Sequence, residues 1–245
     1  MHATSSVIVH RALARCATSA LAPLFARLVV STPARAQSAL GLDGTLFIDG
    51  VTLEDDERIG PLHETAREDR NNVGLFGGAI HYLHQLGDGV MSGFRLGGEF
   101  RFIGEYATER DDGERDKQVL GTLFELGFRG DWTTEIAAHL GLSVGLRWDL
   151  AILAPGGDFA DEIDRLADEG VPTSDGPRLG LSLIPSVGAR YALHERIHAR
   201  FDVGFGWTWL DLFGIDAGVQ GIQYVRDASV SGLRFEVSLG VELTL

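Results

Sequence analysis

His139, Ser143 and Asp149 are the residues whose types could support nucleophilic catalysis. A serine hydroxyl becomes a nucleophile when a histidine within hydrogen-bonding distance takes its proton and a carboxylate orients that histidine. The three positions would share one face of a strand, but strand residues four apart are separated by roughly 13 Å. We therefore interpret them as polar residues of a strand face and predict that the protein is not an enzyme.

The histidines do not have a spacing that indicates a metal site. His81 and His84 would lie on opposite faces of a regular strand, so they could not chelate one ion. His198, which is followed at alternate positions by Arg200 and Asp202, is interpreted as polar packing. The sequence contains no zinc-finger, phosphate-loop or nucleophile-elbow motif. We expect neither a metal nor a cofactor.

Carboxylates cluster in three segments, Glu54–Glu57, Asp111–Glu114 and Asp158–Glu169. Such hard oxygen ligands could bind divalent cations that are shared with lipopolysaccharide. The alternative is that the segments are solvated loops, kept soluble by their charge. Phe159, Ile163 and Leu166 recur at helical spacing in the third segment, which predicts a short amphipathic helix there.

The overall charge restricts the class of partner. The 245 residues include 35 acidic and 21 basic residues, a net charge of −14, whereas nucleic-acid binding requires a basic surface. We therefore expect no nucleic-acid partner. Hydrophobic residues make up 44% of the chain, enough for a sizeable core. The 32 glycines exceed the usual share of about 7%, and this excess needs a structural reason.

Residues 1–36 have the composition of an export signal. They contain four arginines and no acid, a mostly apolar segment at 16–30, and a small-x-small sequence that ends at Ala36. We predict a secretory signal peptide cleaved after Ala36, which leaves a mature chain of residues 37–245. The alternative is an unstructured leader or a mitochondrial-type presequence. Cleavage would remove Cys16, the only cysteine, as suits an exported protein without disulfides.

From Leu40 onward the hydrophobic pattern has a period of two, which indicates strands. Strong alternation occurs in six segments, Phe94–Tyr106, Leu120–Phe128, Ala138–Ile152, Leu179–Leu193, Ile197–Trp209 and Leu233–Leu245. Two weaker segments precede them, Leu40–Val51 and Asn72–Gln85. The sequence therefore predicts eight strands. Pro185 lies within one of them and removes a ladder hydrogen bond, so we expect a bulge or a local break there.

The connections between these strands alternate in length. Those after the second, fourth and sixth strands are short, residues 86–90, 130–134 and 194–195. Those after the first, third, fifth and seventh are long, residues 54–71, 107–117, 153–178 and 210–230. This pattern predicts an all-β fold, an eight-stranded antiparallel up-and-down barrel with its long loops at one end and its termini at the other.

The charged face of the strands would lie outside a soluble, lipocalin-like barrel but inside a membrane barrel. Glycines gather on this face, where they would make room for Arg and Glu side chains in a narrow lumen. Aromatic residues collect at strand ends on the apolar face, as they do at the two membrane interfaces. Both features favour a transmembrane barrel. The predicted charged network of its interior comprises Arg95, Glu99, Arg101, Glu105, Glu125, Arg147, Asp149, Arg190, Arg200, Asp202, Arg234 and Glu236. The predicted aromatic girdles comprise Tyr82, Phe94, Phe128 and Tyr191 near the terminal end, and Tyr106, Trp148, Trp207 and Trp209 near the other.

With these alternating strands and connection lengths, residues 37–245 resemble the small outer-membrane β-barrels of Gram-negative bacteria, of the OmpA transmembrane-domain, OmpX and OmpW types. The resemblance implies short periplasmic turns, long extracellular loops, and contact with outer-membrane lipids and lipopolysaccharide. It also implies a monomer whose last strand is recognised by the β-barrel assembly machinery. That strand, Leu233–Leu245, alternates as in these families but has Leu245 in place of their final aromatic residue.

The sequence thus predicts a bacterial outer-membrane barrel that is structural or forms a narrow porin-like channel, with surface interactions through its loops. The alternatives are an adhesin or ligand-binding barrel, an enzyme that modifies outer-membrane lipids, and a soluble lipocalin-like binder. An eight-stranded barrel is only just wide enough for its side chains to fill it, so its interior charges should pair across the lumen.

Overall fold

The computed structural model describes residues 37–72, 75–87, 93–110 and 117–245. The predicted signal peptide, residues 1–36, lies outside the described residues, as do parts of the connections predicted at 86–90 and 107–117. The elements of the described part are β1 (Ser38–Ile59), β2 (Leu62–Asn72), β3 (Leu75–Gln85), β4 (Phe94–Arg110), β5 (Lys117–Ala137), β6 (Leu140–Pro155), α2 (Asp158–Asp168), β7 (Arg178–Ala192), β8 (Ile197–Val219) and β9 (Ile222–Thr244). No helix among these residues is long and apolar enough to cross a membrane.

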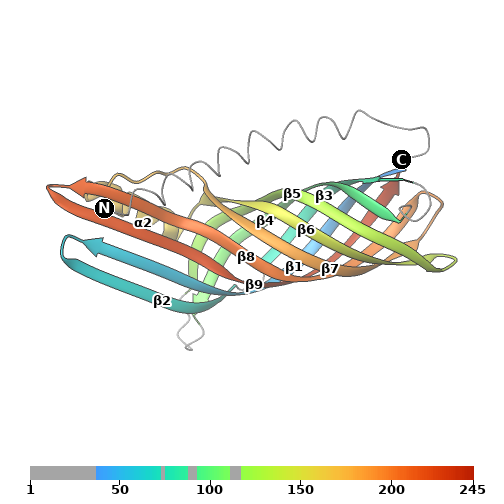
Figure 1. Cartoon of the computed structure of the whole chain (residues 1–245), viewed down its shortest axis with the longest axis horizontal. Coiled ribbons are helices and arrows are strands. Elements are labelled where there is room, and N and C mark those ends of the chain that lie inside the picture. The colour runs from blue at the N-terminus through green and yellow to red at the C-terminus, as the bar shows by residue number, and fades with distance from the viewer. Residues whose placement is uncertain (1–36, 73–74, 88–92, 111–116) are drawn as a thin grey trace. The chain divides into compact units, whose positions relative to one another are not determined.

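The strands form one closed antiparallel sheet (Figure 1). β1 pairs with β9 along one edge, which closes the ring. Along its other edge, β1 pairs first with β3 and then with β2. Because β2 and β3 share one place beside β1, the nine strands form an eight-stranded barrel in chain order. The predicted eight-stranded up-and-down barrel is therefore confirmed.

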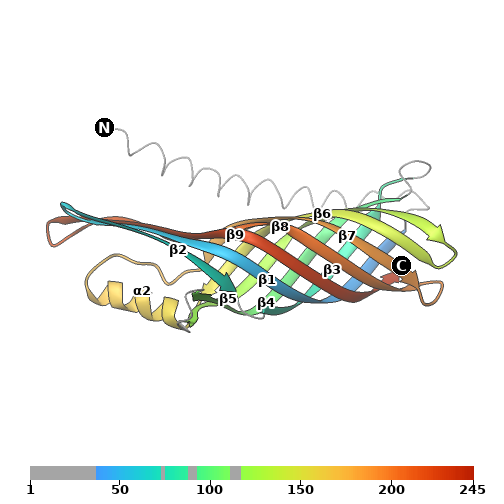
Figure 2. The ribbon, with the colours of Figure 1, turned by 90° about the horizontal axis from the view of Figure 1, so that it is seen from below.

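Two β-hairpins extend beyond the barrel at the same end as α2, opposite the C-terminus (Figures 1 and 2). The first arm comprises residues 53–70 of β1 and β2, and the second arm comprises residues 211–230 of β8 and β9. β8 and β9 each have 23 residues, more than twice the 9–11 that span a membrane. Gln220 and Gly221 form the turn of the second arm with φ values of 50° and 84°, the left-handed conformation of a two-residue hairpin turn.

The prediction of long loops at residues 54–71 and 210–230 is wrong, because these residues form the two hairpin arms. In the first arm, Arg67 pairs with Glu54 at 3.1 Å, and at its base Asp69 accepts a hydrogen bond from Thr52 of the barrel at 2.8 Å. Charged cross-strand pairs of this kind stabilise a solvated hairpin without any apolar alternation. The first arm therefore lacks the alternating pattern that indicates the strands of the barrel.

The turn between β5 and β6 also differs from its prediction at residues 130–134. β5 continues to Ala137, and the turn consists of Ala138 and His139. Gly130 and Asp131 are common turn residues, but here both belong to the ladder that pairs β4 with β5. His139 consequently lies in a turn and not on the inner face of a strand.

A β-bulge in β4 exchanges the two faces of that strand. The register between β4 and β5 shifts between Ile103 and Glu105. The Glu105 side chain is 56% exposed and pairs with Lys117, whereas Tyr106 is buried inside the barrel. The predictions of Glu105 as an interior charge and of Tyr106 as a girdle residue are wrong, because one inserted residue reverses the alternation.

Pro185 produces the local break that its type predicts. The ladder between β7 and β8 has no paired residues between Leu183 and Ser186, although its register is the same on both sides. The ladder between β6 and β7 continues through Pro185, which faces Leu146. The missing N–H of proline thus interrupts the pairing on one side only.

The outward face of the barrel is apolar and exposed. Phe76, Leu239 and Leu42 are 73%, 67% and 61% exposed, and Leu142, Val144 and Leu146 form an exposed apolar row along β6. The alternate residues of the same strands are buried within the barrel and include charged residues such as Asp43, Arg147 and Glu236. In a soluble barrel the apolar side chains face inward and the charged ones face outward. The opposite arrangement seen here fits a surface that faces lipid.

We expect Leu146→Arg to destabilise the barrel in lipid vesicles by about 2–4 kcal/mol, because an arginine near the bilayer midplane must be transferred into hydrocarbon. Denaturant unfolding of the vesicle-inserted protein measures the effect. Leu62→Arg at the tip of the first arm is the matched control, since Leu62 is 70% exposed outside the barrel, and it should change the stability little. Equal effects of the two substitutions would contradict a lipid-facing outer surface.

Candidate functional site in the barrel lumen

Alternate residues of the strands place their charged side chains in the lumen. We define the lumen network as nine carboxylates and seven arginines that are linked by ion pairs. The carboxylates are Asp43, Asp49, Glu99, Glu125, Asp131, Asp149, Asp202, Glu236 and Glu242. The arginines are Arg95, Arg101, Arg129, Arg147, Arg190, Arg200 and Arg234. All are buried except Arg190, whose side chain is 21% exposed at the terminal end.

The terminal half of the network is a chain of alternating charges. The Glu242 carboxylate forms ion pairs with Arg190 at 2.5 Å and with Arg95 at 2.7 Å. The chain continues through Asp131, which lies 2.8 Å from Arg95 and 3.0 Å from Arg200. Its next links are Arg200–Asp202 at 2.6 Å, Arg129–Asp202 at 3.2 Å and Arg129–Glu99 at 3.0 Å. Most carboxylates therefore bridge two arginines, so the pairs are not independent.

The outer half of the network continues from Glu99. Arg101 lies 2.6 Å from Glu99 and 3.0 Å from Glu236, and Glu236 also receives Arg147 at 2.6 Å. Further close pairs are Arg147–Asp149 at 2.5 Å, Arg234–Glu125 and Arg234–Asp49 at 2.9 Å. Buried charges are tolerated when they are paired and hydrogen-bonded in this way. The predicted pairing across the interior is thus present in the structure.

Several glycines leave space that the carboxylates of this network occupy. A Cβ atom at Gly240 would lie 1.9 Å from Asp43 Oδ1, and one at Gly188 would lie 2.3 Å from Asp202 Oδ1. A Cβ at Gly127 would lie 2.2 Å from both Asp149 Oδ1 and the Trp148 carbonyl oxygen. At these three positions glycine has the role that the sequence suggested, which is to leave room for charged side chains in a narrow lumen.

The lumen becomes apolar toward the arms, and Phe47 marks the boundary. The guanidinium groups of Arg101 and Arg234 each lie 5.2 Å from the centre of its buried ring. Such cation–π contacts join the charged zone to the apolar one. Above them lies a buried cluster that includes Val51, Ile103, Tyr106, Leu120, Leu123, Leu153, Leu210 and Val230.

α2 completes this apolar cluster. Phe159, Ile163 and Leu166 are all buried in it, as their helical spacing predicts. The Phe159 ring lies 5.1 Å from that of Phe213 in an edge-on contact. The Asp158 carboxylate accepts a hydrogen bond from the Val119 backbone N–H at 2.7 Å. The helix thus covers the lumen from the side of the arms.

One ion-pair bridge fastens α2 to both arms. Arg226 of β9 lies 2.6 Å from Glu162 of α2 and 2.7 Å from Asp55 of β1. Arg165 of the helix donates to the same Glu162 carboxylate at 2.8 and 2.9 Å. Hydrogen bonds from Arg165 and then Arg226 lower the pKa of Glu162 from its usual 4.5 to about 2.

Every predicted interior charge except Glu105 belongs to the lumen network, and Arg190 lies at the terminal rim of this network. Asp43, Asp49, His81, Arg129 and Asp131 also belong to the site although they were not among the predicted interior charges, and Glu242, which lies on the charged face of the last predicted strand, belongs to it as well. Arg129 and Asp131 were missed because β5 was predicted to end at Phe128. Asp43, Asp49 and Glu242 did have a signal, since each alternates with outward leucine, isoleucine or valine residues.

The aromatic girdles are only partly as predicted. Tyr82, Trp148, Tyr191 and Trp207 are exposed on the outer face. Phe94, Phe128 and Trp209 are half-buried. Phe128 pairs with Trp148 across the ladder, and their ring centres lie 6.4 Å apart. The two cannot belong to opposite girdles, because β5 extends nine residues beyond its predicted end.

The residues considered for nucleophilic catalysis are not brought together. Ser143 is buried on β6 and faces Gly188 across the ladder, and Asp149 accepts from Arg147 at 2.5 Å. His139 lies in the β5–β6 turn. No described hydrogen bond joins His139 to Ser143 or Asp149 among the residues that the structure covers.

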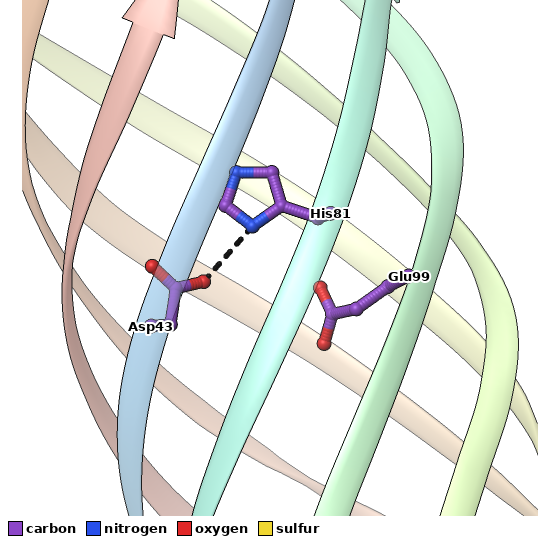
Figure 3. Close-up of side chains that lie close together, drawn as sticks. All are labelled: Asp43, His81 and Glu99. Carbon is purple, nitrogen blue, oxygen red and sulfur yellow. Dashed lines mark ion pairs between the residues drawn. The ribbon is translucent and has the colours of Figure 1, made fainter.

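Asp43, His81 and Glu99 bring three potential metal ligands together in the terminal half of the lumen (Figure 3). One ligand atom from each lies within 4.8 Å of the other two. His81 Nδ1 is 3.1 Å from Asp43 Oδ2, the contact drawn in Figure 3. His84 is not part of this cluster, whose members come from three strands.

A cavity of about 400 Å³ opens at the terminal end of the barrel. Arg95, Arg190 and His198 line it together with Trp132 and Glu135. Arg190 and His198 are joined by a 3.1 Å contact between Nη2 and Nδ1. The position of His198 at this rim agrees with its interpretation as polar packing.

We expect Arg101→Ala to destabilise the barrel by about 3–5 kcal/mol, because it leaves Glu99 and Glu236 with one buried partner fewer. Leu140→Val, a half-buried change at the start of β6, should cost less than about 1.5 kcal/mol. Denaturant unfolding in micelles compares the two variants. Similar losses would contradict a stabilising lumen network.

Lowering the pH should loosen α2. The folded-state pKa of Glu162 is depressed to about 2 from 4.5, so its contribution is fully present above pH 4.5 and is lost as the pH falls toward 2. Pepsin cleavage within residues 156–177 measures the opening of the helix. The ratio of cleavage rates between Glu162→Gln and the wild type should exceed one at pH 5 and approach one near pH 2. A ratio that does not change with pH would contradict the role of this carboxylate.

No family model matches the sequence, and no curated protein matches it either. Solved structures do match. OprG of Pseudomonas aeruginosa superposes with a TM-score of 0.51 at 12% identity, covering 86% of this chain and 97% of that one. Ail of Yersinia pestis has a TM-score of 0.35 at 8% identity, covering 82% and 99%. Neisserial surface protein A has a TM-score of 0.34 at 13% identity, covering 81% and 96%. The likeness to OprG shows that the chain has the fold of a small outer-membrane β-barrel protein.

Proposed function

We propose that the protein is a non-enzymatic bacterial outer-membrane barrel whose lumen is closed to solutes and whose interactions are made by its arms. The observation that carries this proposal is that the described lumen is filled at two successive levels. The charged network occupies the terminal part, and the apolar cluster with α2 occupies the part beneath the arms. An eight-stranded barrel has no further width for a solute path beside such side chains.

The outer surface supports the location. Its apolar side chains match a hydrocarbon environment and would contact outer-membrane lipids directly. The arms extend beyond the length that a membrane requires and would stand among lipopolysaccharide headgroups or above them. In this setting the protein acts as a monomer, with the regular outward alternation of β9 presented to the barrel assembly machinery.

The arms support a role at the surface. The outer face of the first arm carries Glu54, Asp56, Arg58, His63 and Arg67, all solvated or half-solvated. Asp56 contacts Arg58 at 3.2 Å and His63 at 3.0 Å, so part of this charge is neutralised within the arm. A polar hairpin whose charges are partly paired with one another offers a polar surface to a polar partner.

A narrow channel is the second candidate. The cavity at the terminal end favours it, since this cavity would be a polar entrance that leads to Arg95 and Arg190. Passage beyond it would require the Arg95–Glu242 and Arg190–Glu242 pairs to separate. This cost is the reason why we favour the closed barrel.

Conductance in planar bilayers separates the two candidates. We expect the wild-type protein to give no regular single-channel steps, because ion pairs and apolar side chains fill the lumen. Heat-modifiable gel migration of the same preparation is the control for folding, and protection of the barrel from protease is the control for insertion. Regular conductance steps from protein that passes both controls would overturn the closed-lumen proposal in favour of the channel.

A further inference from the structure

The cluster of Asp43, His81 and Glu99 follows directly from the register of three neighbouring strands. His81 of β3 is paired with Gly41 of β1 on one side and with Glu99 of β4 on the other. Asp43 is two residues from Gly41, so its side chain points to the same side. Figure 3 shows the three side chains converging from β1, β3 and β4.

The donor atoms of Asp43 and His81 are buried without hydrogen-bond partners. The side chains of Asp43 and His81 are 1% and 0% exposed. Among the residues that the structure describes, neither oxygen of Asp43 forms a hydrogen bond and neither does His81 Nδ1. Their one close contact among these residues is the 3.1 Å ion pair with each other, since the nearest arginine to Asp43, Arg129, is 3.9 Å away. Leaving such groups unsatisfied costs roughly 1–3 kcal/mol each, and more when they are charged. Asp43 therefore has the character of a ligand without its cation.

The charge of the network points the same way. Its nine carboxylates exceed its seven arginines by two. In a low-dielectric lumen an uncompensated charge is expensive, so cations or protons must make up the difference. A divalent cation beside Asp43 supplies two positive charges and leaves His81 neutral, which is the form of imidazole that binds metals.

The backbone is shaped around this cluster. A Cβ at Gly41 would lie 2.2 Å from the His81 ring, and a Cβ at Gly240 would lie 1.9 Å from Asp43 Oδ1. Glycine at both positions allows the imidazole and the carboxylate to approach each other over the backbone of β1 and β9. The 3.1 Å between His81 Nδ1 and Asp43 Oδ2 is close to the ~3.3 Å that separates two ligands of a tetrahedral zinc ion.

The neighbouring cations fit an outer shell around such a site. Arg129 Nη1 lies 3.0 Å from Glu99 Oε2 and 3.9 Å from Asp43 Oδ2. Arg101 also holds Glu99, at 2.6 Å. Carboxylate ligands of metals are commonly hydrogen-bonded in this manner. On the far side of the ring, His81 Nε2 lies 3.3 Å from Arg200 Nη1 and 3.9 Å from Glu242 Oε2.

We propose that Asp43, His81 and Glu99 bind a divalent first-row transition-metal ion, with zinc as the probe. One imidazole nitrogen and two carboxylates suit zinc and its neighbours, whereas magnesium and calcium prefer oxygen ligands alone. The ion would cross-link β1, β3 and β4 and would be acquired while the barrel closes, because its ligands are buried in the finished lumen. The acidic clusters of the arms are not part of this site.

The full chain is refolded in micelles with Zn²⁺ or with EDTA, passed through gel filtration and analysed for metal content. The wild-type protein should retain about one zinc per chain, the stoichiometry of a single closed site. Asp43→Asn and His81→Gln should fall to the level of the EDTA sample. Glu125→Gln, which removes a buried carboxylate elsewhere in the network, and His63→Gln, which removes an exposed histidine, should both retain the metal.

Two results would overturn the proposal. One is folded wild-type protein that holds no more metal than its EDTA control. The other is His81→Gln protein that holds as much metal as the wild type, which would place the metal at another site. If the lumen variants fail to fold, X-ray absorption of the zinc-loaded wild type decides, because a first shell without an imidazole contradicts the assignment. A cobalt-loaded sample should show the visible absorption of a four- or five-coordinate site.

Discussion

The structure depends on one constraint, which is that every charge placed inside an eight-stranded barrel must find an opposite charge inside it. The lumen is only wide enough for the side chains of its own walls, so water cannot solvate an arginine there as it would at a surface. The lumen network meets this demand by making most of its carboxylates bridge two guanidinium groups, as Glu99 does for Arg101 and Arg129. Glycines opposite these carboxylates are the steric counterpart of the same constraint.

The constraint also explains why the lumen has two zones. An ion pair across the lumen needs partner residues on several strands at the same height along the barrel axis. Such partners are available where all eight strands form the wall. Toward the arms the wall is incomplete, because β7 pairs with β8 only as far as Leu210 and β2 pairs with β4 only over residues 70–72. Apolar side chains and the amphipathic face of α2 fill this part. Phe47 joins the zones because its ring contacts the guanidinium groups of Arg101 and Arg234 and also belongs to the buried apolar cluster.

The sequence predicted the parts of the fold that rest on alternation. The eight strands, the closed ring, the inward charges and the helix around Ile163 all follow from periods of two or about 3.6 residues. The failures have local causes that alternation does not record. The bulge at Gly104 exchanges Glu105 and Tyr106, and Asp131 resembles a turn residue although it pairs with Arg95 in the lumen. The Asp43–His81–Glu99 cluster could not be found from sequence, because it depends on the register between three strands. His81 therefore has no identifiable partner until its pairing with Gly41 and Glu99 is known.

The lumen is closed at one level by the charged network and at another by the apolar cluster with α2. The two are held in place differently, and this difference determines which part of the protein can change shape. Members of the lumen network come from seven strands, so separating them requires the barrel itself to open. α2 is attached to the barrel mainly by side-chain packing, by the Arg226–Glu162 pair and by one hydrogen bond from Val119. Gly157 and Gly170, with φ values of 54° and 84°, lie just outside its two ends. Segments with few backbone bonds to the rest of a protein occupy the low-stability end of its local opening equilibria. Displacing α2 would uncover the apolar cluster but leave every ion pair of the lumen network in place. Displacement of α2 alone would therefore change the outer surface of the protein without creating a path through its lumen.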